Sequence, residues 1–286
     1  MTHEALPRLY AVLGDPIAHS RSPAMHNAAF AALGSPDRYV ALRVGAADLP
    51  AALAGVRALG FSGVNLTIPH KQAARSLVDA VTLAAARIGA INTVIVEGGR
   101  LCGDNTDGRG FMAGLAELGG APVEVAAVLG TGGAARAIVD ALCHELGVRR
   151  VLWVSRRPDQ LAAELASMSK ESVSKTSLEP CDYPGLVTAL GSLDLLVHAT
   201  PVGMVGGPTR LPVALDLASM GARRARVVDV VYPRTALVER ARSVGCPAQD
   251  GLPMLLWQGV FALEGWRGAP LPAAAIAAMR AALQPV

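Results

Sequence analysis

The stretch VEVAAVLGTGGAARA, from Val123 to Ala137, decides the fold of this chain. An apolar run of strand length leads into a cluster of glycines, and an alanine-rich helix pattern follows to about Leu146. A second apolar run, Val151 to Ser155, comes soon after that helix. A strand, a glycine-rich turn, a helix and a second strand within about 30 residues form a parallel βαβ unit, so the pattern predicts an α/β fold.

The glycines have the spacing of a dinucleotide-binding turn. Gly130, Gly132 and Gly133 lie in the turn, and Ala135 occupies the sixth position of the G-x-G-x-x-G pattern, where alanine still allows close helix packing. In a Rossmann unit of this kind the cofactor pyrophosphate lies at the helix N-terminus. The three glycines are therefore expected to bind a pyrophosphate.

The end of the second strand indicates which dinucleotide is bound. An NAD site usually has an acid there that binds the ribose hydroxyls, but this chain has Ser155, Arg156 and Arg157. A hydroxyl and two guanidinium groups suit a 2′-phosphate. The sequence therefore predicts NADP, although one of the two arginines is expected to be only solvated.

The first third of the chain repeats a rhythm of strands and helices. The expected strands are 8–14, 39–44 and a short one within 63–71, and the expected helices are 22–34, 48–59, 72–78 and 82–88. This rhythm predicts a largely parallel sheet. A hairpin with Gly98 and Gly99 at its turn is expected to follow.

Two serines lie at the start of the first expected helix. Ser22 precedes Pro23, which is a helix start signal, so Ser22 is expected to cap the helix. Ser20 lies two residues earlier. Because free backbone N–H groups and the helix dipole favour an anion at such a position, both hydroxyls are expected near an anionic ligand.

The stretch GVNLTIPHK, Gly63 to Lys71, contains an unusual lysine. Only three of the 26 basic residues are lysines, and Lys71 is the only lysine in the first 169 residues. A lysine can give and take a proton, whereas a guanidinium stays charged. Asn65, Thr67 and Lys71 lie at the carboxyl end of an expected strand, where open α/β sheets bind ligands. The alternative is an ordinary surface lysine.

The motif GDNTDG, Gly103 to Gly108, places Asp107 at the start of a helix expected to reach Leu118. An N-cap is the ordinary role of an aspartate in that position. Later in the chain, Ser167 to Ser177 is expected to be an exposed loop, and buried strands are expected at 194–199 and 226–231. The last expected helices are 235–244, one running through residue 265, and 272–283.

The composition excludes several classes of protein. The chain is 52% hydrophobic and 17% charged, with a net charge of +3 and 4% aromatic residues, so nucleic acid is not an expected partner. No segment approaches 18 consecutive apolar residues, and no signal-peptide pattern precedes the first strand, so we expect a cytoplasmic protein without a membrane partner. The four cysteines lack a C-x-x-C pair, and His19, His26 and His70 have no metal-site spacing, so no metal is expected.

Seven motifs occur along the chain in the order HSRSPAMHN, GVNLTIPHK, GAINT, GDNTDG, LGTGGAARA, ATPVGM and DGLPMLLWQ. Together they resemble the shikimate dehydrogenase family over essentially the whole length. The resemblance implies the reversible NADPH-dependent reduction of 3-dehydroshikimate to shikimate, in the biosynthesis of chorismate and aromatic amino acids. It also implies a substrate domain, 1–108, completed by helices within 256–286, and a Rossmann domain, 109–255, in a monomer or homodimer.

The resemblance also assigns roles to residues at matching positions. Lys71 and Asp107 are the implied catalytic pair: the lysine gives a proton to the developing alkoxide, and the aspartate holds the ammonium. Ser20 and Ser22 would hold the substrate carboxylate; the other implied substrate-binding residues are Asn65, Thr67, Asn92, Tyr232 and Gln258. The implied cofactor-binding residues are Gly130, Gly132, Gly133, Ala134, Ser155, Arg156, Arg157, Thr200, Val230, Gly251 and Met254.

Two alternative functions fit the motifs, and two residues differ from the usual family pattern. A quinate/shikimate dehydrogenase that uses NAD is the nearest alternative, and a nucleotide-binding regulator without turnover is a remote one. His198 stands where the family often has asparagine, and Thr131 stands where alanine is usual. We expect His198 to be a core or strand-end histidine with its hydrogen bonds satisfied.

Overall fold

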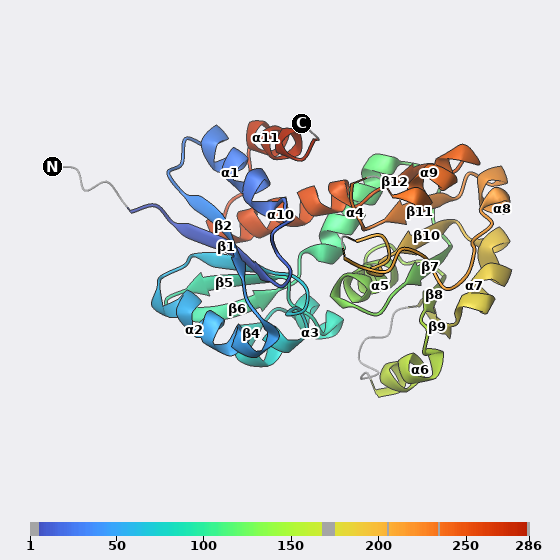
Figure 1. Ribbon diagram of the computed structural model, residues 1–286, viewed down its shortest axis with the longest axis horizontal. Coiled ribbons are helices and arrows are strands. Elements are labelled where there is room, and N and C mark those ends of the chain that lie inside the picture. The colour runs from blue at the N-terminus through green and yellow to red at the C-terminus, as the bar shows by residue number, and fades with distance from the viewer. Residues whose placement is uncertain (1–5, 168–174, 205, 234, 285–286) are drawn as a thin grey trace. The chain divides into compact units, whose positions relative to one another are not determined.

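The computed structural model describes residues 6–167, 175–204, 206–233 and 235–284 (Figure 1). The chain divides into a first unit, residues 1–110 and 255–286, and a second unit, residues 111–254. The chain enters the second unit within helix α4, Asp107–Leu118, and leaves it within helix α10, Leu252–Arg267. Both units combine helices with a sheet, which confirms the predicted α/β fold.

The second unit has a parallel sheet with strand order β12-β11-β10-β7-β8-β9. Its strands are β7 (Val125–Leu129), β8 (Arg150–Val154), β9 (Ser177–Cys181), β10 (Leu195–His198), β11 (Arg226–Asp229) and β12 (Ala248–Gln249). The chain builds outward from β7 through β8 to β9, and then starts again at β10 on the other side of β7. The switch point between β7 and β10 is the place where sheets of this kind bind ligands, at the carboxyl ends of the strands.

Helices cover both faces of this sheet. Successive strand residues point to opposite faces, so Val125, Ala127 and Leu129 of β7 pack in one core cluster while Ala126 and Val128 pack in the other. The cluster around Ala126 and Val128 includes residues of α4, α5 (Gly133–His144) and α6 (Pro158–Ser167). The opposite cluster includes residues of α7 (Tyr183–Ala189), α8 (Ala218–Ala222) and α9 (Ala236–Ser243). Burial on both faces explains why β7 reads as a continuous apolar run.

The first unit has a sheet of strand order β2-β1-β3-β5-β6-β4. Its strands are β1 (Leu9–Gly14), β2 (Arg38–Arg43), β3 (Gly63–Leu66), β4 (Ala80–Val81), β5 (Thr93–Glu97) and β6 (Arg100–Asp104). Strand β1 pairs in parallel with β2 and β3, and β4 pairs in parallel with β6. The predicted hairpin is confirmed: β5 and β6 are antiparallel and joined by Gly98 and Gly99, both of which have positive φ.

Helices also cover both faces of the first sheet. Residues of α2 (Leu49–Ala58) and α3 (Leu83–Ile88) share a core cluster with Ala11 and Leu13 of β1. Tyr10, which alternates with them, packs against Phe30 of α1 (Ser22–Ala32) and Trp266 of α10. Figure 1 shows α1 beside α11 (Ala273–Ala282), although these helices come from opposite ends of the chain. The C-terminal helices therefore complete the first unit.

Several local expectations were wrong. Ser22 is not the N-cap of α1: Arg21 is the cap, without a side-chain cap bond, because the backbone is already helical at Arg21. Residues Ala73–Leu77 form a 3-10 helix instead of an α-helix, and Ala46–Asp48 form a separate 3-10 turn before α2. The short strands β4 and β12 and the helices α6, α7 and α8 were not predicted.

The expected exposed loop from Ser167 to Ser177 is only partly described. Helix α6 ends at Ser167, and β9 begins at Ser177. Residues 168–174 lie outside the described residues, so the loop itself stays a prediction.

Candidate active site

A lysine and an aspartate form an ion pair in the first unit. Lys71 follows β3, and Asp107 is the first residue of α4. Lys71 Nζ donates a hydrogen bond to Asp107 Oδ2 over 2.5 Å. The Lys71 side chain is 17% exposed, whereas that of Asp107 is 5% exposed. Lys71 is therefore the member of the pair that a ligand can more readily reach.

Asp107 is held on more than one side. Asn92 Nδ2 donates to Asp107 Oδ1 over 2.8 Å, so both carboxylate oxygens accept a side-chain hydrogen bond. The Asp107 N–H donates to Asn105 Oδ1 over 3.0 Å. Asp107 also lies in the first turn of α4, where the helix dipole favours negative charge. The carboxylate thus presents Lys71 in one orientation.

Asn92 connects this pair to a larger set of side chains. Its Oδ1 accepts from the Thr106 N–H over 2.8 Å and from Thr93 Oγ1 over 2.9 Å. Its Nδ2 lies 3.4 Å from Gln258 Oε1, and Thr106 Oγ1 donates to the Gln258 carbonyl oxygen over 3.0 Å. Asn92, Thr93 and Thr106 are all buried. Because their polar groups bond to one another, their orientations are fixed.

The set continues toward α1 through a buried tyrosine. Asn65 Nδ2 donates to Thr93 Oγ1 over 3.1 Å, and Tyr39 OH donates to Asn65 Oδ1 over 2.7 Å. Burial raises the pKa of Tyr39 well above its usual value, and the Ser22 hydroxyl partly opposes this shift. The phenol therefore stays protonated and remains a hydrogen-bond donor.

Together these side chains form a polar network, whose members are Ser22, Tyr39, Asn65, Lys71, Asn92, Thr93, Thr106, Asp107 and Gln258. Ser20 joins it through its Oγ, which accepts from the Ser22 N–H over 3.3 Å. Thr67 lies outside the network as it is described: its N–H donates to the Leu13 carbonyl oxygen, and its methyl lies against Gly14.

Three network members were missed by the sequence reasoning. Thr93 and Thr106 stand inside the quoted motifs GAINT and GDNTDG, so their polar side chains beside Asn92 and Asp107 were a usable signal. Tyr39 had no such signal, because its bond to Asn65 depends on how β2 lies relative to β3.

In the second unit the glycine loop, residues 130–133, leaves its backbone open. Gly130 has φ +111, and a Cβ there would lie 2.5 Å from the Ala199 carbonyl oxygen. A Cβ on Gly132 would meet nothing within 4 Å, and α5 begins at Gly133 with Ala134 in its first turn. No side chain caps this helix, so its N-terminal N–H groups can bind an anion. The loop therefore fits a pyrophosphate.

The neighbouring side chains keep the glycine loop in place. Trp153 Nε1 donates to the Gly130 carbonyl oxygen over 2.6 Å. Arg136 Nε donates to the Thr131 carbonyl oxygen over 3.2 Å, and its guanidinium lies 5.9 Å from the centre of the Trp153 ring. Thr131, which stands where the family usually has alanine, accepts this hydrogen bond with its backbone carbonyl oxygen. Its side chain is therefore not needed for these bonds.

The carboxyl end of β8 presents the predicted cations. Arg156 and Arg157 are exposed, and Ser155 Oγ accepts from the Arg157 N–H over 3.0 Å. Arg157 Nη1 lies 3.4 Å from Gln160 Oε1. Two exposed guanidinium groups at this strand end are compatible with a 2′-phosphate.

Comparison with known proteins identifies the family. The family described as "Shikimate dehydrogenase substrate binding domain" matches residues 12–94. A relative from Methylobacterium radiotolerans named shikimate dehydrogenase (NADP(+)) is 44% identical over 272 residues, which are 92% of this chain and 92% of the relative. The chain belongs to the shikimate dehydrogenase family.

Solved structures agree with this assignment. Shikimate 5-dehydrogenase from Thermus thermophilus, crystallised with NADP(H) and shikimate, is 38% identical, with a TM-score of 0.81 over 96% of this chain and 100% of the other. Shikimate 5-dehydrogenase from Listeria monocytogenes, crystallised with shikimate and NAD, is 32% identical, with a TM-score of 0.83 over 99% of each chain. The two relatives thus differ in the nicotinamide cofactor that was bound.

In this shikimate dehydrogenase family member, the other predicted cofactor residues lie on the β10 and β11 side of the second unit. Thr200 follows β10 and Val230 follows β11. A Cβ on Gly251 would lie 2.0 Å from the Val230 carbonyl oxygen, so the two segments touch. Met254 packs in the core cluster that Val230 borders. Tyr232, predicted to bind substrate, also belongs to the second unit.

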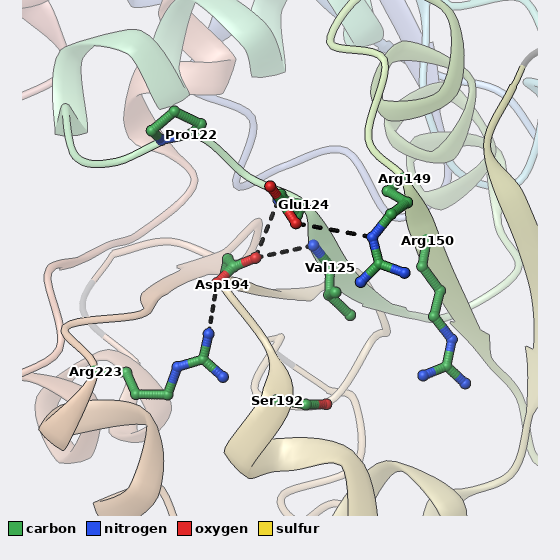
Figure 2. Close-up of a pocket in the computed structure, with 8 residues that line it drawn as sticks. All are labelled: Pro122, Glu124, Val125, Arg149, Arg150, Ser192, Asp194 and Arg223. Carbon is green, nitrogen blue, oxygen red and sulfur yellow. Dashed lines mark hydrogen bonds and ion pairs between the residues drawn. The ribbon is translucent and has the colours of Figure 1, made fainter.

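A hollow of about 480 Å³ lies elsewhere in the second unit, beside the amino ends of β7, β8 and β10 (Figure 2). It is lined by Pro122, Glu124, Val125, Arg149, Arg150, Ser192, Asp194 and Arg223. Its charges are paired: Figure 2 shows Glu124 with Arg149 and Asp194 with Arg223, while Arg150 binds Glu179. The predicted site residues are not part of its lining, so this hollow is not the candidate site.

The described residues contain neither a cluster of metal ligands nor a helix of membrane-spanning length and hydrophobicity. No group of three or more His, Cys, Asp or Glu residues could hold a metal ion there. None of the helices described is long and apolar enough to cross a membrane. Of the histidines, His70 is buried and its Nε2 donates to the Val44 carbonyl oxygen, and His26 is stacked on Tyr39.

Proposed function

We propose that this protein catalyses the reversible reduction of 3-dehydroshikimate to shikimate with NADPH. The Lys71–Asp107 pair carries the proposal, because ketone reduction needs a positioned proton donor and this pair provides one. The named NADP(+)-dependent relatives, more than 40% identical over about nine tenths of the chain, support the same reaction.

Lys71 is the proposed proton donor. NADPH, when bound, supplies the hydride that reaches the carbonyl carbon. The carbonyl oxygen gains negative charge in that step, and protonated Lys71 gives its proton to this oxygen. In the oxidation direction, neutral Lys71 takes the hydroxyl proton. Asp107 orients the ammonium through its 2.5 Å hydrogen bond, and Asn92 holds the other carboxylate oxygen.

Further residues, most of them in the polar network or bonded to it, are proposed to hold the substrate. Ser20 and Ser22 bind the carboxylate, since both lie at the start of α1, where backbone N–H groups favour an anion. The proposed hydroxyl-binding residues are Asn65, Thr67, Asn92, Gln258 and Tyr232. Of these, Thr67 and Tyr232 lie outside the polar network.

The cofactor is proposed to be NADP. The glycine loop would bind the pyrophosphate, and Ser155, Arg156 and Arg157 would bind the 2′-phosphate. The remaining proposed contacts are Ala134, Thr200, Val230, Gly251 and Met254. Residues 1–108 with 256–286 would form the substrate domain and 109–255 the NADP domain, a division supported by the two units.

The nearest alternative is a quinate/shikimate dehydrogenase that uses NAD. The relative from Listeria monocytogenes was crystallised with NAD, but the exposed arginines after β8 favour NADP in this chain. We also propose a cytoplasmic location and a monomeric or homodimeric state. Gel filtration would test the latter.

A steady-state assay with shikimate and with quinate, each with NADP and with NAD, separates these functions. We expect the highest kcat/KM with shikimate and NADP. Rates with quinate and NAD that equal or exceed those with shikimate and NADP would overturn the proposal. A lack of turnover with all four pairs, in a protein that binds NADP, would favour the regulator.

A further inference from the structure

His198 is a buried residue of the second unit that the proposed reaction does not use. It is the last residue of β10, is 2% exposed, and pairs in register with Asp229 at the end of β11. His198 Nδ1 lies 2.8 Å from Asp229 Oδ1, and Nε2 lies 2.5 Å from Thr200 Oγ1. The prediction of a strand-end histidine with satisfied hydrogen bonds is therefore confirmed.

The partners of the ring determine the direction of each hydrogen bond. A carboxylate only accepts, so His198 Nδ1 carries the hydrogen and donates to Asp229. Asp229 Oδ1 is held in turn by the Val231 N–H over 3.0 Å. In the neutral ring Nε2 must then accept, so Thr200 Oγ1 donates to it. We assign this tautomer from the hydrogen-bond network.

This chain of bonds fixes the Thr200 side chain. Thr200 Oγ1 gives its hydrogen to His198 and accepts from the Val202 N–H over 3.3 Å. The Thr200 methyl is directed toward the glycine loop, where a Cβ on Gly130 would lie 3.3 Å from it. Asp229, through His198, therefore sets the position of a side chain that lies beside the glycine loop.

The strand order shows which half of a dinucleotide meets Thr200. The switch point lies between β7 and β10, and a dinucleotide lies across it with its pyrophosphate at the glycine loop. The arginines proposed for the 2′-phosphate follow β8, on one side of β7, so the adenosine half belongs there. The nicotinamide half therefore belongs on the opposite side, beyond β10 and β11, where Thr200 and Val230 lie.

We propose that His198 and Asp229 are positioning residues for the nicotinamide half of the cofactor and act through the Thr200 hydroxyl. The inference rests on the proposed function for the identity of the cofactor. The open glycine loop and the exposed arginines, which fit a phosphorylated dinucleotide, are independent of this chain of bonds.

Direct binding measurements test the inference. NADP⁺ and adenosine 2′,5′-bisphosphate share the adenosine half, but only NADP⁺ has a nicotinamide. Thr200→Val and His198→Phe are each expected to raise the Kd of NADP⁺ by about two- to tenfold, the effect of one hydrogen bond. The Kd of the bisphosphate should stay unchanged. Thr200→Ser keeps the hydroxyl and should bind NADP⁺ like the wild type.

The double variant shows whether the two residues act as a unit. If His198 acts through Thr200, the variant with both Thr200→Val and His198→Phe should have a Kd for NADP⁺ no higher than the higher of the two single-variant values. Additive losses would mean independent roles, and an equal loss of bisphosphate binding would mean a general distortion; either result overturns the inference.

A measurement on the unmutated protein covers the case in which His198→Phe fails to fold. Imidazole nitrogen NMR should show His198 with hydrogen on Nδ1 and a bare Nε2. Hydrogen on Nε2 alone would overturn the assignment. Wild-type turnover with shikimate reports separately on the proposed function, because the variants are judged only by binding relative to the wild type.

Discussion

The two binding regions are built from different groups. In the first unit the candidate substrate site consists of side chains that bond to one another; Asn92 alone bonds to Thr93, Thr106 and Asp107. In the second unit the candidate cofactor site consists mainly of backbone at the glycine loop, with exposed Arg156 and Arg157 at the neighbouring strand end. The candidate substrate site is buried and joined by hydrogen bonds between its side chains, whereas the candidate cofactor site is open.

The difference matches the tasks that the two regions would perform. Proton transfer requires the donor within hydrogen-bond reach of the reacting oxygen, so a side chain held by a fixed network has an advantage. A phosphorylated dinucleotide carries several charges, and free backbone N–H groups and exposed guanidinium groups can bind it without such precise placement. The comparison predicts that single changes in the polar network affect turnover, whereas changes at the cofactor site affect affinity.

Lys71→Ala should have the largest effect. We expect kcat to fall about a hundred- to ten-thousandfold, because the variant loses the general acid. The KM for shikimate should change little, since the proton-transfer role belongs to the transition state. Steady-state kinetics and shikimate binding measure the two effects. The exposed Lys175→Ala is the matched control and should leave both constants unchanged. Lost shikimate binding with preserved turnover would make Lys71 an anchor instead.

The sequence predicted those parts of the site that depend on local order. The glycine loop was recognised because its glycines follow an apolar strand and precede a helix within one short segment. Lys71 and Asp107 were singled out by composition, by position at the ends of expected elements, and by the family motifs. Strand β7 was predictable because burial on both faces leaves a continuous apolar run, and α5 because a buried helix face leaves apolar residues at helical spacing.

The features that the sequence did not predict depend mainly on contacts between distant segments. Tyr39 bonds to Asn65 of another strand, and His198 meets Asp229 only through the register of β10 and β11. The strands β4 and β12 contain two residues each, which is too short for a periodic pattern. Ser22 had the residue type of a cap, but the helical backbone at Arg21 moved the cap one position earlier.

Acid should weaken the packing behind the polar network. His26 is fully buried, stacks on Tyr39 at 4.3 Å between ring centres, and neither ring nitrogen has a hydrogen-bond partner among the described residues. Burial lowers the pKa of His26 to about 3. The unfolded chain, with a histidine pKa of about 6.5, binds a proton that the folded protein does not bind between these values. Stability is therefore lost as the pH falls below 6.5.

This loss can be measured by chemical unfolding at several pH values. From pH 6.5 to pH 5 the contribution of His26 is about 2 kcal/mol, at about 1.4 kcal/mol per pH unit. His26→Phe keeps an aromatic ring beside Tyr39 but cannot take up a proton. We expect the unfolding free energy of this variant to depend less steeply on pH. The difference in slope should correspond to the uptake of at most one proton on unfolding. Equal slopes for the wild type and the variant would contradict a buried neutral His26.

The arginines after β8 should show the smallest effect, and it should be confined to affinity. Arg156→Ala and Arg157→Ala are each expected to raise the KM for NADP by about tenfold, because an exposed ion pair with the 2′-phosphate is lost. The KM for NAD should not change, since NAD lacks this phosphate. Arg149→Ala removes another exposed arginine, just before the other end of β8, and should change neither value. If one variant alone shows the loss, the other arginine is only solvated. A loss of kcat at saturating NADP would contradict the division between an open affinity site and a fixed catalytic network.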